Sequence, residues 1–326
     1  MMTLTDQFGR RIEYLRISVT DRCNFRCLYC MPERGLQWLP KHDILSYEEI
    51  TSIVRELAPL GLRRLRITGG EPTIRPNLTA LIGMLRSVPE IEDIALSTNG
   101  VKLPELAGEM CTAGLDRVNM SADSLRSERI AQIARRTLPF SPVDAALAAE
   151  RAGLAPIKVN MVVMRGINDD ELLDFARLTL DHPWHVRFIE LMPVGDMREL
   201  TWSHVVPSDE LLDRLSSIDA LVPDAGPARG NGPARYFRFG GAPGTVGVIT
   251  PMTHTYCGSC NRVRLTADGR LRTCLYGTQE VSLRDALRSG RPLLPLYTQA
   301  LAEKPKEHQL LKLEVGGLRA LSEVGG

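Results

Sequence analysis

Strand-like runs of hydrophobic residues alternate with helix-like segments along the chain from residue 14 to residue 191. Ser46, Ser141 and Asn168 each precede a helical segment and are followed three residues later by an acidic residue, a spacing typical of helix capping boxes. The pattern predicts six strands, at residues 14–19, 62–68, 91–97, 115–121, 157–164 and 185–191, and helices at residues 46–61, 77–88, 104–113, 142–153 and from residue 168 onward.

Six strand–helix steps joined by short connections predict a parallel sheet covered by helices. Polar and glycine-rich residues recur at the C-terminal ends of the predicted strands, where α/β barrels and open α/β sheets carry their sites. Six units are too few for a closed eight-stranded barrel. We therefore expect an α/β fold built on a partial (β/α)6 TIM-type barrel with an open side.

The pattern changes after residue 193. Beyond it we expect helices at residues 208–218, 283–288 and 293–302, a glycine- and proline-rich loop at residues 226–244, and a strand at residues 244–250. Asp268-Gly269 is typical of a hairpin turn. We expect two domains: residues 1–220 form the partial barrel, and residues 221–326 form a C-terminal segment that closes its open side.

Composition narrows the class of protein. The 326 residues are 44% hydrophobic and 24% charged with a net charge of +1, which fits a globular protein without bulk attraction to nucleic acid or to a membrane surface. No apolar run approaches the roughly 20 residues needed to span a bilayer, and the N-terminus holds no apolar signal core. We therefore expect a cytoplasmic protein. Seven cysteines, six of them in two tight groups, indicate metal binding instead of disulfides in such a reducing compartment.

Cys23, Cys27 and Cys30 form the first group, directly after the first predicted strand. Three thiolates on one loop can hold three corners of a [4Fe–4S] cube and leave one iron open to a small molecule. A half-zinc site and a set of reduced core thiols are the alternatives, since zinc spacing normally comes as paired Cys-x2-Cys units. Cys111 stands alone on a predicted helix, where packing is the usual role.

Cys257, Cys260 and Cys274 form the second group, on a loop and a hairpin arm. Their spacing fits a zinc site with His254 as fourth ligand as well as it fits an iron–sulfur cluster. The presence of the first group favours a second cluster, with an open iron that a substrate can occupy.

The turn Gly69-Gly70-Glu71-Pro72 follows the second predicted strand, beside the first cysteine group. Two glycines allow the backbone to approach a ligand closely. We expect exposed carbonyls and the Glu71 carboxylate to accept hydrogen bonds from an ammonium group. A simple strand-to-helix turn is the alternative.

These motifs together resemble those of the radical S-adenosylmethionine (SAM) enzymes, which carry Cys-x3-Cys-x2-Cys after the first strand of a partial barrel and Gly-Gly-Glu-Pro after the second. Residues 15–27, 66–72, 187–193, the second cysteine group with residues 261–264 and the terminal Gly-Gly are similar to the GTP 3′,8-cyclase family over essentially the whole chain. The resemblance implies conversion of GTP to (8S)-3′,8-cyclo-7,8-dihydro-GTP through a 5′-deoxyadenosyl radical, the first step of molybdenum cofactor biosynthesis. The radical abstracts the ribose 3′ hydrogen, and the carbon radical attacks C8 of guanine.

The resemblance also implies site residues. The [4Fe–4S] cluster that binds SAM falls on Cys23, Cys27 and Cys30, and a second, substrate-side cluster falls on Cys257, Cys260 and Cys274. The SAM positions are Tyr29, Gly70, Ser121 and Met192. The GTP positions are Arg16, Arg66, Ser97, Lys158, Arg262, Val263 and Arg264, of which Arg16, Arg262 and Arg264 are expected nearest the chemistry. Position 97 is usually threonine in the family, and serine keeps the hydroxyl.

Charge on the predicted strands agrees with an anionic substrate. GTP carries about four negative charges, and the chain has no Gly-x4-Gly-Lys-Ser/Thr phosphate loop, so side-chain cations must bind it. Arg16, Arg66, Lys158 and Arg187 lie on four different predicted strands and are expected to face one barrel interior or its mouth. A buried cation without a partner is unfavourable, so an anionic ligand explains several of them at once. Each one alone is more simply a surface charge.

The terminal Gly325-Gly326 fits an activated acyl tail, as in small ubiquitin-like carriers, or a frayed terminus. The resemblance implies instead that it reaches into the active site. It further implies an external electron donor, a homodimer, and transfer of the product to the pyranopterin monophosphate synthase. Two other functions remain as alternatives: a radical SAM enzyme with an auxiliary cluster that modifies a peptide or inserts sulfur, and an electron-transfer or zinc-stabilised scaffold protein.

Overall fold

A sheet of twelve strands forms the centre of the fold in the computed structural model, which describes residues 4–192, 200–226, 232–308 and 319–325. The strand order is β12-β11-β10-β1-β2-β3-β4-β5-β6-β9-β8-β7. Six parallel strands occupy its middle in chain order: β1 (Tyr14–Ser18), β2 (Arg64–Thr68), β3 (Asp93–Thr98), β4 (Arg117–Ser121), β5 (Lys158–Val163) and β6 (His185–Glu190). They confirm the predicted strands to within two residues at each end.

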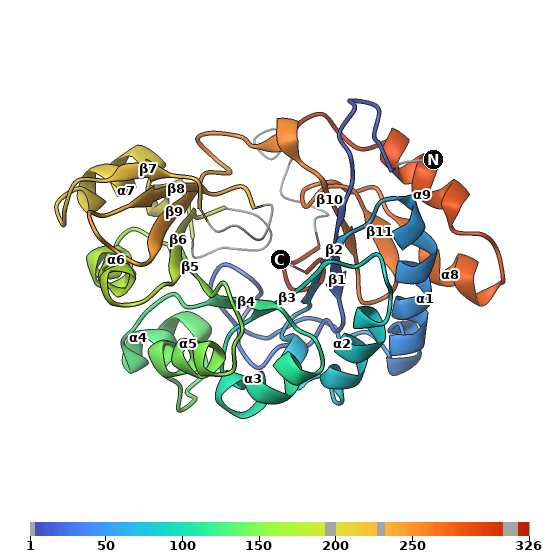
Figure 1. The fold of residues 1–326 in the computed structure, drawn as a ribbon, viewed down its shortest axis with the longest axis horizontal. Helices are drawn as coiled ribbons and strands as arrows, with labels where there is room; N and C mark the ends of the chain where they lie inside the picture. Colours follow the sequence, from blue (N-terminus) through green and yellow to red (C-terminus); the bar gives the residue numbers. More distant parts are fainter. Residues whose placement is uncertain (1–3, 193–199, 227–231, 309–318, 326) are drawn as a thin grey trace.

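Six helices cover one face of this sheet (Figure 1). They are α1 (Tyr47–Leu57), α2 (Leu78–Arg86), α3 (Leu103–Thr112), α4 (Ser127–Ala134), α5 (Pro142–Arg151) and α6 (Leu172–Asp181), of which α4 was not predicted. The apolar sides of α1, α2, α3, α5 and α6 form one core with the strand residues on that face, such as the fully buried Ile53 of α1 and Ile67 of β2, whereas Ile133 of α4 packs in a smaller cluster with Met164 and Leu191. No helix in the described part of the chain is both long enough and apolar enough to cross a membrane.

The predicted helix caps form in part. Ser46 makes both bonds of its capping box with Glu49. Ser141 makes only the bond from the start of α5 to its own hydroxyl. The prediction for Asn168 is wrong, because its side-chain oxygen accepts a hydrogen bond from the Met164 backbone N–H and α6 begins only after a short 3-10 turn.

The C-terminal segment extends the sheet at both edges. Parallel strands come first, β9 (Thr245–Ile249) beside β6 and β10 (Arg262–Leu265) beside β1. Antiparallel strands lie beyond them, namely β8 (Arg235–Arg238), β7 (Val222–Asp224), β11 (Arg270–Arg272) and β12 (Val281–Ser282). Strand β8 corrects the loop predicted at residues 226–244. Among the described residues the two edge strands, β7 and β12, are not paired with each other, so hydrogen bonds do not close the sheet.

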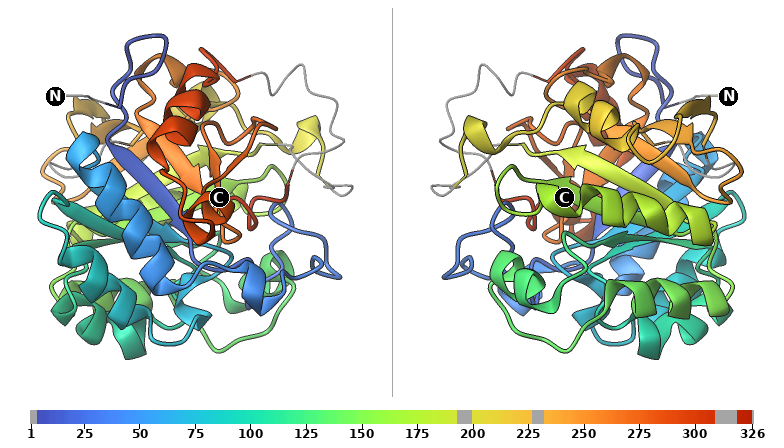
Figure 2. Two further views of the ribbon diagram at one scale, coloured as in Figure 1. Left: turned by 90° about the vertical axis from the view of Figure 1, so that its right-hand side faces the viewer. Right: turned by 90° about the vertical axis from the view of Figure 1, so that its left-hand side faces the viewer.

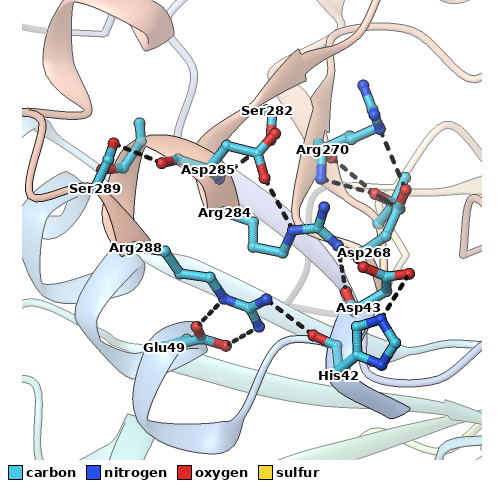
Figure 3. A network of polar contacts seen from close by, with 12 residues as sticks. His42, Asp43, Glu49, Asp268, Arg270, Ser282, Arg284, Asp285, Arg288 and Ser289 are labelled. Atoms are coloured by element: carbon cyan, nitrogen blue, oxygen red, sulfur yellow. Dashed lines mark hydrogen bonds and ion pairs between the residues drawn. The ribbon is translucent and has the colours of Figure 1, made fainter. Parts of the chain in front are cut away.

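Two C-terminal helices, α8 (Leu283–Arg288) and α9 (Leu294–Ala302), lie next to α1 (Figures 1 and 2), whereas α7 (Ser208–Leu215) packs on α6. Arg288 of α8 donates hydrogen bonds to both carboxylate oxygens of Glu49, at 2.6 and 3.1 Å (Figure 3). Arg284 donates to the carboxylate and the carbonyl of Asp43, at 3.0 and 2.8 Å. Because Glu49 also closes the cap of α1, these bonds join the C-terminal segment to the first strand–helix unit, on the side of the sheet where β10 pairs with β1.

Candidate active site

A cavity of about 210 Å³ lies on the face of the sheet opposite the helices. Strands β1 to β6, β9 and β10 contribute to its wall. It brings together eight of the predicted SAM and GTP residues: Arg16, Tyr29, Arg66, Ser97, Ser121, Met192, Arg262 and Arg264. Gly70, Lys158 and Val263 are not part of its lining.

Strand pairing explains why the arginines meet. Arg16 of β1 is the register partner of Arg66 on β2 and of Arg264 on β10. Side chains two residues apart on a strand point to the same face, so Arg262 joins Arg264 in the cavity. Val263, between them, is fully buried in the core on the opposite face, which restricts its predicted contact with GTP to the backbone.

Positive charge dominates the cavity. The charged residues among the described lining are Arg16, Arg66, Arg187, Arg262, Arg264 and a single carboxylate, Asp123. Burial, and then the charge of Arg262, lowers the pKa of Arg264 to about 10. Burial also lowers the pKa of Arg16 well below its usual value, and the charges of Arg264 and Arg66 add to this effect. An anion with several charges would relieve this repulsion.

Behind the cavity, the buried cations Arg117 and Lys158 differ in their surroundings. Arg117 donates two hydrogen bonds to Asp93, at 2.6 and 2.8 Å, and forms a buried structural pair. Lys158 is buried, and its burial, followed by the charges of Arg187 and Arg117, lowers its pKa to about 5. The amine of Lys158 is therefore neutral near pH 7 until an anion approaches it.

The first cysteine loop, residues 20–30, packs directly against the end of β2. The Gly70 N–H donates a hydrogen bond to the Thr20 carbonyl at 2.7 Å. A Cβ atom on Gly70 would lie 2.2 Å from the carbonyl oxygen of Arg22, so only glycine permits this approach. The structure thus places Gly70 beneath the loop that carries the cysteines.

The three thiols of this loop suit an iron–sulfur cluster. Cys23, Cys27 and Cys30 are partly buried, and burial raises the pKa of Cys23 to about 11 and that of Cys30 to about 12. The Phe25 N–H donates to the Cys23 sulfur at 3.3 Å, a contact of the kind that orients and tunes metal-bound thiolates. Bound iron would neutralise the thiolate charge that burial disfavours.

The predicted role of Glu71 is wrong. Its carboxylate is buried and accepts hydrogen bonds from the Thr73 N–H at 3.0 Å, the Thr98 hydroxyl at 2.8 Å and the Asn99 N–H at 2.6 Å. Protein donors therefore occupy the oxygens that were expected to face an ammonium group. Glu71 instead joins the end of β2 to the end of β3.

Asp123 is a cavity residue that sequence reasoning missed. Its carboxylate accepts hydrogen bonds from the Tyr29 hydroxyl at 2.7 Å and from the Val162 N–H at 2.9 Å. Burial raises the pKa of Asp123 to about 6. The available signal was its place two residues after Ser121, just beyond the end of a predicted strand. Asp123 fixes the orientation of Tyr29 in the cavity.

The second cysteine group lies around the start of β10. Cys257 begins a 3-10 turn (Cys257–Ser259) before this strand, Cys260 follows the turn directly, and Cys274 comes after β11. His254, the fourth ligand in the zinc alternative, is exposed, and its ring lies 4.0 Å from the carboxylate of Asp209, which weakens that alternative. No three His, Cys, Asp or Glu side chains in the described ranges gather closely enough to hold a single metal ion. A cube instead spreads its thiolates over different irons.

The end of the described chain enters the cavity region, on the inner side of the sheet (Figure 1). The Gly325 carbonyl accepts hydrogen bonds from Arg264 at 2.7 Å and from Arg16 at 3.1 Å. Its φ is 69°, and a Cβ atom would lie 2.7 Å from the Thr68 methyl group, so the position requires glycine. Gly325 thus lies where the resemblance implies, and Gly326 lies outside the described residues.

A pair of carboxylates anchors this tail. Arg319 donates two hydrogen bonds of 3.1 Å to Asp268 and one of 2.8 Å to Glu280. Two residues further on, Leu321 lines the cavity and packs in one apolar cluster with Met192. The tail therefore completes the wall beside a predicted SAM residue.

Comparison with known families finds two matches along the chain. Residues 17–179 match the Radical SAM superfamily, and residues 184–310 match the Molybdenum Cofactor Synthesis C family. The curated GTP 3′,8-cyclase of Heliobacterium modesticaldum is 44% identical over 99% of this chain and 100% of its own length. The enzyme of the same name from Pelotomaculum thermopropionicum is 46% identical over 99% of this chain and 100% of its own length.

Among solved structures, SuiB of Streptococcus suis bound to S-adenosylmethionine has a similar fold, with a TM-score of 0.59. The superposition covers 88% of this chain and 65% of that chain, at 12% identity. At this identity the likeness concerns the fold alone.

Proposed function

This chain belongs to the GTP 3′,8-cyclase family of radical SAM enzymes, and we propose that its arginine-lined cavity binds GTP for conversion to (8S)-3′,8-cyclo-7,8-dihydro-GTP. The enzyme acts in molybdenum cofactor biosynthesis, in agreement with its C-terminal family match. One observation carries the assignment of the substrate site: five arginines meet in one cavity, with three-cysteine groups nearby. A polyphosphate accounts for so many guanidinium groups, because each can bind phosphate oxygens in a bidentate way.

Radical SAM enzymes use a [4Fe–4S] cluster and SAM, and the first cysteine loop would hold that cluster here. When both are bound, they supply a 5′-deoxyadenosyl radical that abstracts hydrogen from C3′ of the ribose. The chain's part is to hold and orient SAM, and Tyr29 has its hydroxyl already fixed by Asp123 for this purpose. Gly70 keeps the loop close to the end of β2. The proposed SAM residues are Tyr29, Gly70, Ser121 and Met192.

The second cysteine group would hold a second [4Fe–4S] cluster, with one iron left for the guanine base. Its thiols lie beside the part of the cavity wall formed by Tyr256 and Leu275, which are their sequence neighbours. The base would therefore lie at this end of the cavity.

Arg16, Arg66, Ser97, Lys158 and the run 262–264 form the proposed GTP site. Arg16 and Arg264 also hold the Gly325 carbonyl, so they connect substrate and tail. Arg187, already expected from the sequence to face the barrel interior, belongs with this set, since it lines the cavity and its guanidinium donates a hydrogen bond to Asn160 at 2.7 Å. Together they orient the triphosphate and exclude water from the reacting ribose.

GTP binding is expected to take up a proton at Lys158. Its pKa of about 5 in the ligand-free chain rises when a triphosphate lies nearby, so the bound state carries a proton that the free state lacks. Affinity should therefore fall as pH rises between the free and the bound pKa. Titration calorimetry at about pH 8, where the triphosphate itself no longer titrates, in buffers of different ionisation enthalpy measures this uptake. Lys158→Met should abolish it, and a wild-type protein that binds GTP without proton uptake would contradict the prediction.

Anaerobic incubation with a reductant, SAM and GTP tests the proposed function. We expect 5′-deoxyadenosine to form only when GTP is present. Formation that depends on a peptide and not on GTP would support the peptide-modifying alternative. Iron and sulfide analysis of the reconstituted chain should find about eight irons, whereas zinc in the second cysteine group would contradict the second cluster.

We propose a cytoplasmic homodimer that receives electrons from an external donor and passes its product to the pyranopterin monophosphate synthase. The seven free cysteines support a reducing compartment. The division at residue 220 stays a prediction, because one continuous sheet contains strands from both parts.

A further inference from the structure

Lys304 follows α9 and directs its ammonium group at the second cysteine group. It is only 2% exposed. Its nitrogen lies 2.5 Å from the Thr273 carbonyl oxygen, 3.0 Å from the Arg262 carbonyl oxygen and 3.6 Å from the Cys260 sulfur. An ammonium group has three donors, and these contacts use all of them.

The charge of this lysine needs an explanation. A buried ammonium ion is unfavourable unless a negative group lies beside it. None of the ion pairs found among the described residues includes Lys304, and of its three acceptors only the Cys260 sulfur can carry negative charge. Metal binding deprotonates its cysteine ligands, so a metal-bound Cys260 would supply that negative charge. The lysine is therefore placed for a metal-bound thiolate.

We propose that Lys304 is a positioning residue of the second cluster, which holds the Cys260 thiolate and stabilises the negative charge of the metal–thiolate group. This inference rests on the second cluster of the proposed function. Lys304 contacts Cys260 itself, the first residue of β10 and the residue before Cys274, so it gathers the segments that supply two of the three ligands. Hydrogen bonds to cluster sulfur favour the reduced state and raise the reduction potential.

The backbone around Lys304 is itself fixed to the second cysteine group. Pro305, Glu307 and His308 line one surface pocket together with Thr273 and Cys274. Arg10 donates to the carbonyl of Cys257 at 2.8 Å and to the carbonyl of Pro305 at 2.7 Å. The segment that carries Lys304 is thus held in place by hydrogen bonds, as is required of a residue that orients a metal ligand.

The test uses full-length protein in which Cys23, Cys27 and Cys30 are replaced by alanine, so that only the second cluster remains. Lys304→Met and Lys304→Gln are compared with this parent after anaerobic reconstitution, with the exposed Lys306→Met as matched control. Lys304→Met is expected to lose iron to a chelator roughly tenfold to hundredfold faster and to show a more negative reduction potential. Lys304→Gln keeps N–H donors without charge, so its rate of iron loss and its reduction potential should lie between those of the parent and those of Lys304→Met. Lys306→Met should match the parent.

The outcomes separate the two proposals. A parent that binds no iron overturns the second cluster and this inference together. A parent that binds iron, with unchanged iron retention and potential in the Lys304 variants, overturns this inference alone. If the methionine variant does not fold, as judged by circular dichroism, the glutamine variant decides through its potential.

Discussion

Replacing Gly70 with alanine is expected to remove iron from the first cysteine loop while the rest of the fold remains. The new Cβ atom would lie 2.2 Å from the carbonyl oxygen and 2.5 Å from the carbonyl carbon of Arg22, and 2.8 Å from the carbonyl oxygen of Asp21. These are backbone atoms, so the loop must move away from β2 and break the hydrogen bond between Gly70 and Thr20. Cys23 follows Arg22 directly and must move with it.

The measurement is iron and sulfide content in a background where the second cysteine group is replaced by alanine, together with SAM cleavage in the otherwise intact enzyme. Both should fall at least about tenfold, because displaced ligands lose a large part of their metal affinity. Gly83→Ala in α2 is the matched control, since nothing lies within 4 Å of its added Cβ atom. This control should keep its iron and gain up to about 1 kcal/mol of stability. Full iron content in the Gly70 variant would refute the argument.

Replacing Arg264 with alanine is expected to abolish GTP-dependent formation of 5′-deoxyadenosine, with a loss of roughly a hundredfold or more. This guanidinium lines the cavity, is paired in register with Arg16 and holds the Gly325 carbonyl at 2.7 Å. Its removal takes away a phosphate contact and releases the tail at the same time. No cysteine in the described ranges hydrogen-bonds to it, so iron content should remain that of the wild type.

Equilibrium binding of GTP separates the two causes. Lost binding means that Arg264 contacts the substrate directly, whereas retained binding without turnover means that it acts through the tail. Arg288→Ala provides the control, because it removes an arginine of the same C-terminal segment from a surface pair with Glu49 (Figure 3). Surface pairs contribute about 1 kcal/mol or less, so turnover should stay near the wild-type value. Wild-type turnover in the Arg264 variant would exclude this residue from the site.

Local pattern sufficed for the parallel core of the fold, because its strands are runs of five or six residues with regularly placed apolar positions that alternate along the chain with helical segments. It failed where tertiary pairing decides the structure. Strand β8 lies in a glycine- and proline-rich stretch and is a strand through its pairing with β9. Asn168 is a residue type that often caps helices, yet its side-chain oxygen accepts a hydrogen bond from the backbone N–H of the earlier residue Met164. The sequence pattern could have predicted helix α4, since Ile130, Ile133 and Ala134 have helical spacing.

The residues of the candidate site also differ in whether local sequence could predict their roles. Cysteine spacing and strand-end arginines are local signals, and family resemblance extended them to positions such as Ser97 and Met192. Partners distant in the chain carried no such signal. The oxygens of Glu71 are occupied by residues of the next strand end, which turned an expected ligand contact into a structural one. In the sequence, Lys304 is only one of several charged residues near the C-terminus. Its role becomes visible through its three contacts, which lie up to 44 residues away in the chain.

The pairing of β1 with β10 joins residues 14–17 to residues 262–265, which are far apart in the chain, and it brings Arg16 beside Arg264. Closing so long a loop is entropically unfavourable, so this pairing is expected late in folding, after β1 to β6 have paired with their near neighbours. A chain that has formed its first cysteine loop but has not yet docked β10 has no complete arginine site for the nucleotide. In this order of folding, substrate capture would wait until β10 is docked, and radical formation beside a loosely held substrate would be avoided.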